Sequence, residues 1–420
     1  MSGGIAITGV GAVSAVGEDV PALTAALLEG RCGIAPLTLF PYQGRSALAA
    51  QVPEGVTVPG TLPAVTARRL SRPDRFALAA ASEACRDAGL DGALRHDAAL
   101  ALGATTGGMF ESEEAYRQRQ TGEAGRFRLS RLLGTSITTA ASVVSQTLGI
   151  YGPQTTVSTA CSSSALAIAL AADAIRRGRA RVAVALGTDG LCRLTYAGFD
   201  ALQALDPEAC RPFDAGRRGL SLGEGAGALV LEDVAHARAR GVRPRALLLG
   251  HATGTDAHHV TAPHPEGVGA LVAFRGALAA AGLPPEAIDY VNAHGSGTRQ
   301  NDAVEVAVLR AVLGSRLARV PVSSTKSQLG HTLGAAGALE AVVTVLALDA
   351  GILPPTVGLR RPDPSFGELD LVPTPGRRLP LAVAASSSIT SAPHAIAASP
   401  DASCAATIAV GPVIPSSIDA

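Results

Sequence analysis

The chain has 420 residues, with 35 Lys and Arg residues against 35 Asp and Glu residues, so its formal net charge is zero. This length suffices for two ordinary domains or for one large unit of two halves, and the balanced charge favours neither nucleic acid nor an anionic membrane as a partner. Because there are 47 glycines and only 3% aromatic residues, we expect a core of Ala, Val and Leu, as in closely packed α/β proteins.

The six cysteines are scattered without the spacing of a metal site, and we therefore expect a reduced, cytoplasmic protein. The N-terminus lacks the basic region and the long apolar core of a signal peptide. Asp173 and Glu340 interrupt the two longest apolar runs. No uninterrupted run of about 18 apolar residues, as a membrane helix needs, is therefore predicted.

Strand and helix patterns alternate along the first part of the chain. They predict a short strand over 4–11, a helix over 20–29, a second helix over 73–88 and a buried strand over 98–103. The Pro- and Gly-rich residues 31–65 are predicted to form surface loops, and the charged segment 111–131 is predicted to be an exposed excursion.

Cys161 is predicted to lie on a turn between a strand and a helix. Residues 155–159 are rich in β-branched side chains, and 165–175 is an apolar run of helix formers. The unpaired N–H groups at the start of a helix favour a thiolate, as a nucleophile requires. The alternative is that Cys161 is a small buried apolar residue. A further strand over 181–187 completes a βαβ unit, which predicts a partly parallel sheet.

The second half of the chain repeats this order. Strands are predicted over 287–294 and 320–324, and helices over 302–313 and 333–348. Since each half contains a strand, a polar turn and a helix that is apolar on nearly every face, we predict two pseudo-symmetric halves, 1–243 and 244–412. Residues 413–420 are expected to form a disordered tail.

Polar turns in the second half contain His294, Lys326 and His331. A Lys at the mouth of a buried helix needs a partner, and Glu340 is the available carboxylate. His331 would stand at a helix start, where the dipole keeps the imidazole neutral. Two neutral imidazoles and a thiol suit acyl transfer followed by carbanion chemistry, although buried histidines of a protein core are the alternative.

Three blocks of sequence resemble the active-site blocks of the elongating β-ketoacyl-acyl carrier protein synthases, which have a Cys-His-His triad. They are Ser158-Thr159-Ala160-Cys161-Ser162-Ser163, Asn292-Ala293-His294-Gly295-Ser296-Gly297-Thr298 with Asn301-Asp302, and Ser324-Thr325-Lys326 with Gly330-His331. Further similarities occur at 211–214, 223–227 and 334–340, and together they cover about residues 3–388 in the family's order. The resemblance implies an α/β, thiolase-like fold of two ketosynthase halves in a five-layered α-β-α-β-α body, which is usually dimeric.

The resemblance also implies a decarboxylative Claisen condensation in fatty acid, polyketide or polyene synthesis. Cys161 would accept an acyl chain from an acyl carrier protein, and His294 and His331 would stabilise the enolate formed from malonyl-carrier protein. Lys326, paired with Glu340, would order the site. The substrates would be carried on phosphopantetheine, and no metal or redox cofactor is implied.

By family position, Ser296 and Thr298 would bind the pantetheine arm, and Phe199 would lie near the acyl pocket. The family carries a Gly-Phe-Gly-Gly gating loop after residue 388, whereas this chain has neither glycine nor an aromatic residue over 389–394. Ser391 stands near the gate position. Either the gate has been rebuilt or the reading frame of the tail is disturbed, and a displaced final strand is predicted over 405–410.

Two groups of arginines are similar in position to the family's docking patch for the acidic carrier protein: Arg68, Arg69 and Arg72, and Arg126 and Arg128. A solvated surface without a partner is the alternative. Retention of the triad indicates a catalytic chain, as a homodimer or as a heterodimer with a chain-length-factor-like homologue. A thiolase-fold protein that binds acyl chains or cleaves thioesters without condensing them is the second alternative.

Overall fold

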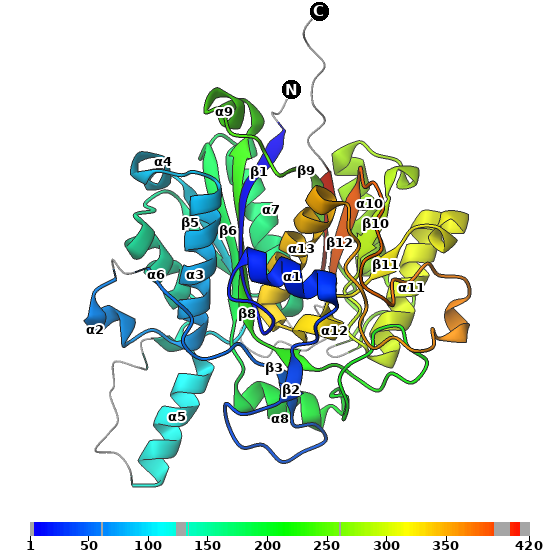
Figure 1. Ribbon diagram of the computed structural model, residues 1–420, viewed down its shortest axis with the longest axis horizontal. Helices are drawn as coiled ribbons and strands as arrows, with labels where there is room; N and C mark the ends of the chain where they lie inside the picture. Colours follow the sequence, from blue (N-terminus) through cyan, green and yellow to red (C-terminus); the bar gives the residue numbers. More distant parts are fainter. Residues whose placement is uncertain are drawn as a thin grey trace, which may run out of the picture.

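The computed structural model describes residues 4–59, 62–122, 132, 134–259, 262–389 and 404–411. Within these residues, ten strands join in one sheet in the order β11-β10-β12-β13-β9-β1-β8-β6-β4-β5 (Figure 1). The first half contributes β1 (Ile5–Val13), β4 (Ala99–Gly103), β5 (Gln154–Val157), β6 (Val182–Asp189) and β8 (Gly225–Asp233). The second half contributes β9 (Ala246–Thr255), β10 (Tyr290–Asn292), β11 (Val322–Ser323), β12 (Ala384–Ile389) and β13 (Cys404–Gly411).

The two halves have the same strand topology. When the five strands of each half are numbered along the chain, both half-sheets have the order third, second, fourth, fifth, first. In each half, the second strand pairs in parallel with the third and the fourth, and the fifth pairs antiparallel with the fourth and the first. The first strands, β1 and β9, pair with one another. The repeat of element order in the sequence therefore corresponds to a repeat of topology.

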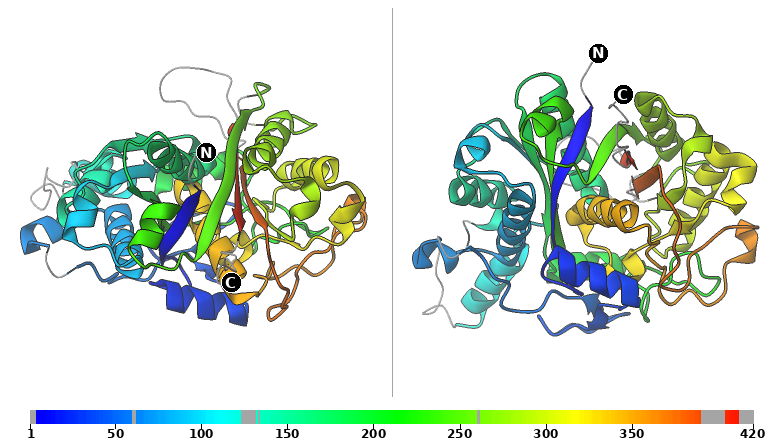
Figure 2. Two further views of the ribbon diagram at one scale, coloured as in Figure 1. Left: turned by 90° about the horizontal axis from the view of Figure 1, so that it is seen from above. Right: turned by 45° about the horizontal axis from the view of Figure 1, so that its top comes forward.

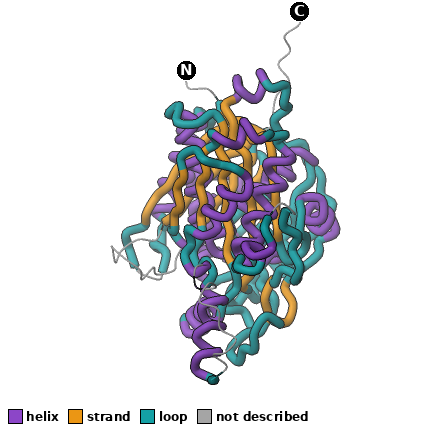
Figure 3. Tube along the Cα trace, turned by 90° about the vertical axis from the view of Figure 1, so that its left-hand side faces the viewer, coloured by secondary structure: helices purple, strands orange, loops and turns teal. Residues whose placement is uncertain are grey.

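Helices cover and separate the half-sheets. The longer helices are α1 (Val20–Glu29), α3 (Arg72–Asp87), α5 (Met109–Gln120), α6 (Thr139–Leu148), α7 (Ser163–Arg176), α10 (Val268–Ala281), α11 (Arg299–Leu313) and α13 (Ala336–Ala350). Helices α7 and α13 lie between the half-sheets, α3 and α6 cover the first, and α10 and α11 cover the second (Figures 1 and 2). These are the five layers of a thiolase-like fold. Figure 3 shows the strands enclosed by helices along the body.

The central helices are largely buried because most of their side chains are apolar on nearly every face. Every residue of α13 from Ala336 to Leu348 is buried. A Cβ added to Gly337 would come within 2.7 Å of the backbone nitrogen of Ala165 on α7, so that the two helices touch through their backbones. The apolar stretch Leu333–Ala350 is long enough to cross a membrane, but 89% of it is buried inside the protein.

Short elements complete the fold: β2 (Ile34–Pro36), β3 (Leu48–Ala50), β7 (Leu222–Gly223), α2 (Ala64–Ala67), α4 (Gly92–His96), α8 (Arg193–Ala201), α9 (Val234–Ala239) and α12 (Lys326–Leu329). The prediction of loops throughout 31–65 was wrong at β2, β3 and α2. β2 and β3 join β7 in a small sheet. The pairing of β3 with β7 spans 173 residues, from Ala49 to Leu222, and local composition does not reveal it. The strand predicted over 405–410 is β13, which lies between β12 and β9.

Candidate active site

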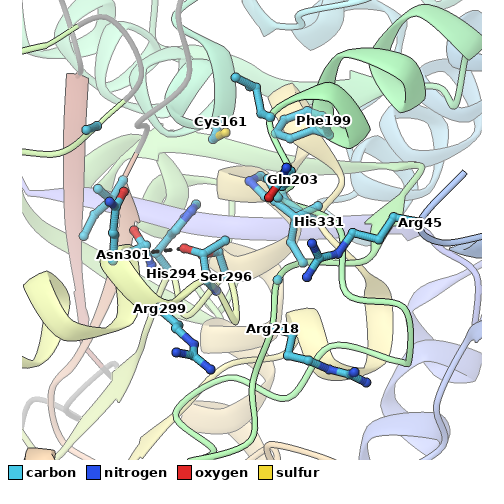
Figure 4. Close-up of a pocket in the computed structure, with 18 of the residues that line it drawn as sticks. Arg45, Cys161, Phe199, Gln203, Arg218, His294, Ser296, Arg299, Asn301 and His331 are labelled. Carbon is cyan, nitrogen blue, oxygen red and sulfur yellow. Dashed lines mark hydrogen bonds between the residues drawn. The ribbon is translucent and has the colours of Figure 1, made fainter.

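A cavity of about 750 Å³ opens between the two halves. Cys161 lines it from the first half, and His294 and His331 line it from the second (Figure 4). Ser296, Thr298 and Phe199 also line this cavity. The structure therefore brings together six of the residues that sequence patterns and family position selected.

Cys161 lies on a sharp turn between β5 and α7. A 3-10 turn over Ala160–Ser162 leads directly into the helix at Ser163. Ala160 has a φ of 54°, a left-handed conformation that costs a non-glycine residue energy. The Ser163 hydroxyl donates to the Ala160 carbonyl at 2.6 Å and accepts from the Thr159 N–H at 2.9 Å. The hydroxyls that follow Cys161 thus hold the turn that directs its sulfur into the cavity.

His294 follows β10 in a loop held by glycines with positive φ, Gly295 and Gly297. The Lys326 ammonium donates to the His294 carbonyl at 2.7 Å and contacts the His294 Nδ1 at 3.2 Å. Because an ammonium group only donates hydrogen bonds, Nδ1 of His294 is the acceptor. The ring proton of a neutral His294 is therefore on Nε2.

His331 reaches the same state through a different partner. Its Nδ1 accepts the backbone N–H of Leu333 at 3.1 Å, which also places the ring proton on Nε2. The two rings lie edge to face with centroids 5.2 Å apart. Burial, followed by the charge of Lys326, holds the pKa of both imidazoles well below the ordinary value of 6.5. Two neutral N–H donors thus occupy one wall of the cavity.

Lys326 forms a buried ion pair with Glu340 on α13, as the sequence predicted. Both residues are 2% exposed. The Ser388 hydroxyl donates to the second oxygen of Glu340 at 3.3 Å. Burial raises the pKa of Glu340, and the Lys326 charge opposes that shift. Through these contacts, the Lys326–Glu340 pair links His294, in the loop after β10, to helix α13.

Sequence patterns did not identify Glu305, which supports the loop of His294. Its carboxylate accepts the backbone N–H groups of His294 and Gly295, both at 2.7 Å, and the Ser387 hydroxyl at 2.7 Å. Burial raises the pKa of Glu305 to about 7 against these hydrogen bonds. Asp302 lies one turn earlier on α11 and accepts the Gly297 N–H at 3.1 Å. Two acids three residues apart after a glycine-rich loop were the signal that could have revealed this support.

Polar and basic residues extend the cavity beyond the triad. The Ser296 and Thr298 hydroxyls contact one another at 3.0 Å. Arg45, Arg218 and Arg299, which the sequence did not single out, also line the cavity (Figure 4). Ile389 contributes from the end of β12, whereas Ser391 lies outside the described residues.

Comparison with known proteins agrees with this arrangement. The family description "Beta-ketoacyl synthase, N-terminal domain" matches residues 3–237, and "Beta-ketoacyl synthase, C-terminal domain" matches residues 245–360. The chain belongs to the β-ketoacyl synthase family. It is therefore an acyltransferase of the class that forms carbon–carbon bonds.

Relatives of this β-ketoacyl synthase include 3-oxoacyl-[acyl-carrier-protein] synthases and polyketide β-ketoacyl synthases. It is 35% identical to 3-oxoacyl-[acyl-carrier-protein] synthase 2 of Synechocystis sp., over 91% of this chain and 94% of that protein. The solved ishigamide ketosynthase/chain length factor is 33% identical, with a TM-score of 0.88 over 98% of this chain and 100% of that one. A type II PKS acyl-carrier protein in complex with its ketosynthase gives 26% identity and a TM-score of 0.83 over 98% and 100%.

The arginines that were predicted to dock the carrier protein lie in different environments. Arg68 and Arg69 are exposed. Arg72 differs from them, because its guanidinium pairs with the fully buried Glu224 and donates to the Val52 carbonyl at 2.9 Å, leaving 15% of the side chain exposed. Arg72 is thus partly buried against the first half, and its part in docking stays a prediction. Arg126 and Arg128 lie outside the described residues.

Proposed function

We propose that this β-ketoacyl synthase divides its reaction between the two halves of the chain, with acyl transfer at Cys161 and decarboxylation at His294 and His331. The observation that supports this most directly is the state of the two imidazoles. Each has its Nδ1 occupied by a donor, so each offers an Nε2–H to the cavity that also contains the Cys161 sulfur. Paired neutral donors stabilise an oxyanion without releasing a proton to it.

In the first step, the Cys161 thiolate attacks the thioester carbonyl of an acyl chain on the phosphopantetheine arm of an acyl carrier protein. The carrier thiolate leaves, takes up a proton, and the acyl group is held as a thioester on Cys161. The turn at Ala160 and the start of α7 support this role, because the amino end of a helix favours negative charge.

In the second step, malonyl-carrier protein binds with its thioester oxygen between the Nε2–H groups of His294 and His331. The bond to the carboxylate breaks, carbon dioxide leaves, and the electron pair forms an enolate whose oxygen accepts both hydrogen bonds. The enolate carbon then attacks the acyl carbonyl, and the Cys161 thiolate departs. These steps balance without a redox or metal cofactor. Ser296 and Thr298 would hold the pantetheine arm, and Phe199 would contact the acyl chain.

We propose that Lys326 and Glu340 act by positioning. Lys326 fixes the tautomer of His294 through Nδ1 and is itself held by Glu340. Its positive charge also favours the neutral form of both imidazoles. The pair therefore sets which ring nitrogen faces the substrate.

We propose that the chain dimerises through the β5 edge, with itself or with a chain-length-factor-like homologue. β5 is one of the two terminal strands of the ten-stranded sheet, and the neighbouring Tyr151 is 64% exposed. An exposed edge strand beside an apolar side chain favours pairing with a second sheet. The solved ishigamide ketosynthase/chain length factor supports a partner of this kind.

We also propose that Arg68 and Arg69 contact the acidic carrier protein, in a cytoplasmic pathway. Their exposure and the solved complex of a related ketosynthase with its acyl-carrier protein support the docking surface. Five cysteines of the described residues are not in disulfides, as in other proteins of a reducing compartment.

The decisive experiment follows Cys161 by intact mass. Purified protein is incubated with acyl-carrier protein and then with malonyl-carrier protein, with and without a candidate partner subunit. We expect an acyl adduct on Cys161 that disappears when malonyl-carrier protein is added, while a β-ketoacyl product forms on the carrier protein. The adduct should be absent in Cys161→Ala, and His331→Ala should lose decarboxylation more than loading. An adduct without any β-ketoacyl product would instead support the acyl-binding or thioester-cleaving alternative.

A further inference from the structure

A buried carboxylate joins the turn of Cys161 to the turn of His331. Asp189 ends β6 and has no exposed surface. It is not among the residues that line the cavity. Its two oxygens accept hydrogen bonds from segments of both halves, and those segments hold the nucleophile and one of the two imidazoles.

On the side of the first half, Asp189 fixes the loop after β4. Its Oδ1 accepts the Thr106 N–H at 2.7 Å and the Thr106 hydroxyl at 2.8 Å, and its Oδ2 accepts the Thr105 N–H at 3.0 Å. The Thr105 hydroxyl in turn donates to the carbonyl of Ala160 at 3.2 Å. Because Ala160 is the left-handed residue that precedes Cys161, this loop supports the nucleophile's turn.

On the side of the second half, Asp189 fixes the turn after His331. Its Oδ2 accepts the Gly334 N–H at 2.7 Å. Gly334 follows Leu333, which has a φ of 51° and whose N–H is the donor to His331 Nδ1. A Cβ on Gly334 would lie 2.6 Å from Asp189 Oδ2 and 2.8 Å from Thr105 Oγ1. The glycine is thus needed for this close approach.

The site requires a carboxylate and not an amide. Both oxygens of Asp189 face backbone N–H groups, so the NH₂ of an asparagine would be placed against a donor. No Lys or Arg of the described residues forms an ion pair with Asp189. Burial raises its pKa, and the hydrogen bonds from Thr106, Thr105 and Gly334 oppose that shift. The backbone N–H groups of the two turns therefore stabilise the negative charge of Asp189 in place of a cation.

We infer that Asp189 is a positioning residue for the decarboxylation step. By holding the turn at 333–334, it sets the direction of the His331 Nε2–H relative to the Cys161 sulfur. This inference rests on the proposed division of the reaction between the two halves. Cys161 keeps further supports, because the Ser163 hydroxyl also holds Ala160, whereas the Leu333 donor of His331 depends on the turn that Asp189 fixes.

The test compares Asp189→Asn with Asp74→Asn. Asp74 is a matched control because it is 2% exposed, accepts a backbone N–H from Ser71 at 2.9 Å, and lies at the start of α3 on the outer face of the first half-sheet. We expect Asp189→Asn to slow malonyl-carrier protein decarboxylation by about 10- to 100-fold, as displacements of the order of 1 Å can, and to slow Cys161 acylation by less than about threefold. In Asp74→Asn the ratio of the two rates should stay at the wild-type value.

Gly334→Ala provides a second variant that keeps the charge of Asp189 but pushes the same turn away. It should shift the ratio of the decarboxylation rate to the acylation rate in the same direction. Both rates are expressed per molecule of folded protein, and the folded fraction is determined by circular dichroism. If the ratio of the two rates stayed at the wild-type value in Asp189→Asn and Gly334→Ala, whether or not both rates fell, the inference would be overturned. Absence of decarboxylation in the wild type would instead count against the proposed function.

Discussion

Replacing Lys326 by methionine separates the structural role of the Lys326–Glu340 pair from its chemical role. The substitution keeps a long, flexible side chain but removes the ammonium that contacts Glu340, the His294 carbonyl and the His294 Nδ1. The Glu340 carboxylate then stays buried without a cation. His294 loses the donor that fixes its tautomer, so its proton can move to Nδ1.

Two magnitudes follow from this geometry. Both partners are 2% exposed, and breaking one side of such a buried pair costs about 3–5 kcal/mol of stability. Loss of one oriented oxyanion donor lowers the rate of the step by about 100- to 1000-fold. Lys326→Met should therefore destabilise the protein and should also slow decarboxylation.

The double variant Lys326→Met/Glu340→Leu distinguishes the two effects. Because neither charge of the Lys326–Glu340 pair is left, the free energy of unfolding in urea should return to within about 1–2 kcal/mol of the wild type. Release of carbon dioxide from labelled malonyl-carrier protein should stay as slow as in the single variant. If the double variant recovered decarboxylation together with stability, the assignment of Lys326 as the group that orients His294 would be refuted.

Three further outcomes are expected. Because burial raises the pKa of Glu305 from 4.5 to about 7, the folded protein binds a proton that the unfolded chain has lost, and stability should fall by about 3 kcal/mol as the pH rises through that interval. Glu305→Gln should remove this pH dependence. If the urea midpoints of the wild type and the variant changed by the same amount between about pH 5 and about pH 8, the prediction would be contradicted. The double substitution Arg68→Glu/Arg69→Glu should raise KM for carrier-bound substrate by about tenfold with little change in kcat, because exposed charges mainly affect how fast the carrier protein associates with the enzyme. An unchanged KM would argue against docking at these arginines. Arg72→Ala should instead cost about 3 kcal/mol by leaving Glu224 buried without its cation, with the same KM; a raised KM and wild-type stability would reverse that assignment.

Local sequence patterns were sufficient to predict the strands and helices that hold Cys161, His294 and His331. The β-branched run before Cys161 and the Ala-rich run after it identify a strand and a buried helix, because each pattern reports the surroundings of its own element. Lys326 and Glu340 were paired in advance, since they lie 14 residues apart on consecutive polar and apolar segments and a buried ammonium needs a partner.

Residues whose partners are distant in the chain were not predictable in this way. Arg72 is indistinguishable from its exposed neighbours Arg68 and Arg69 until Glu224, 152 residues away, is seen to pair with it. Asp189 likewise combines donors from 105–106 and from 334. Non-local hydrogen bonds of this kind depend on how layers stack, and a single sequence contains no record of that stacking.

The position of β13 has a consequence for how the chain acquires its shape during synthesis. The strand Cys404–Gly411 lies between β12 and β9, inside the sheet of the second half. The ribosome makes this strand after the other nine described strands of the sheet, so β13 cannot join β9 to β12 until residue 411 has left the exit tunnel. The first half can assemble before β13 has been made, whereas the sheet of the second half cannot be completed until β13 has emerged from the ribosome. We therefore expect nascent chains to spend their longest unprotected interval with His294 and His331 already made but not yet held in place.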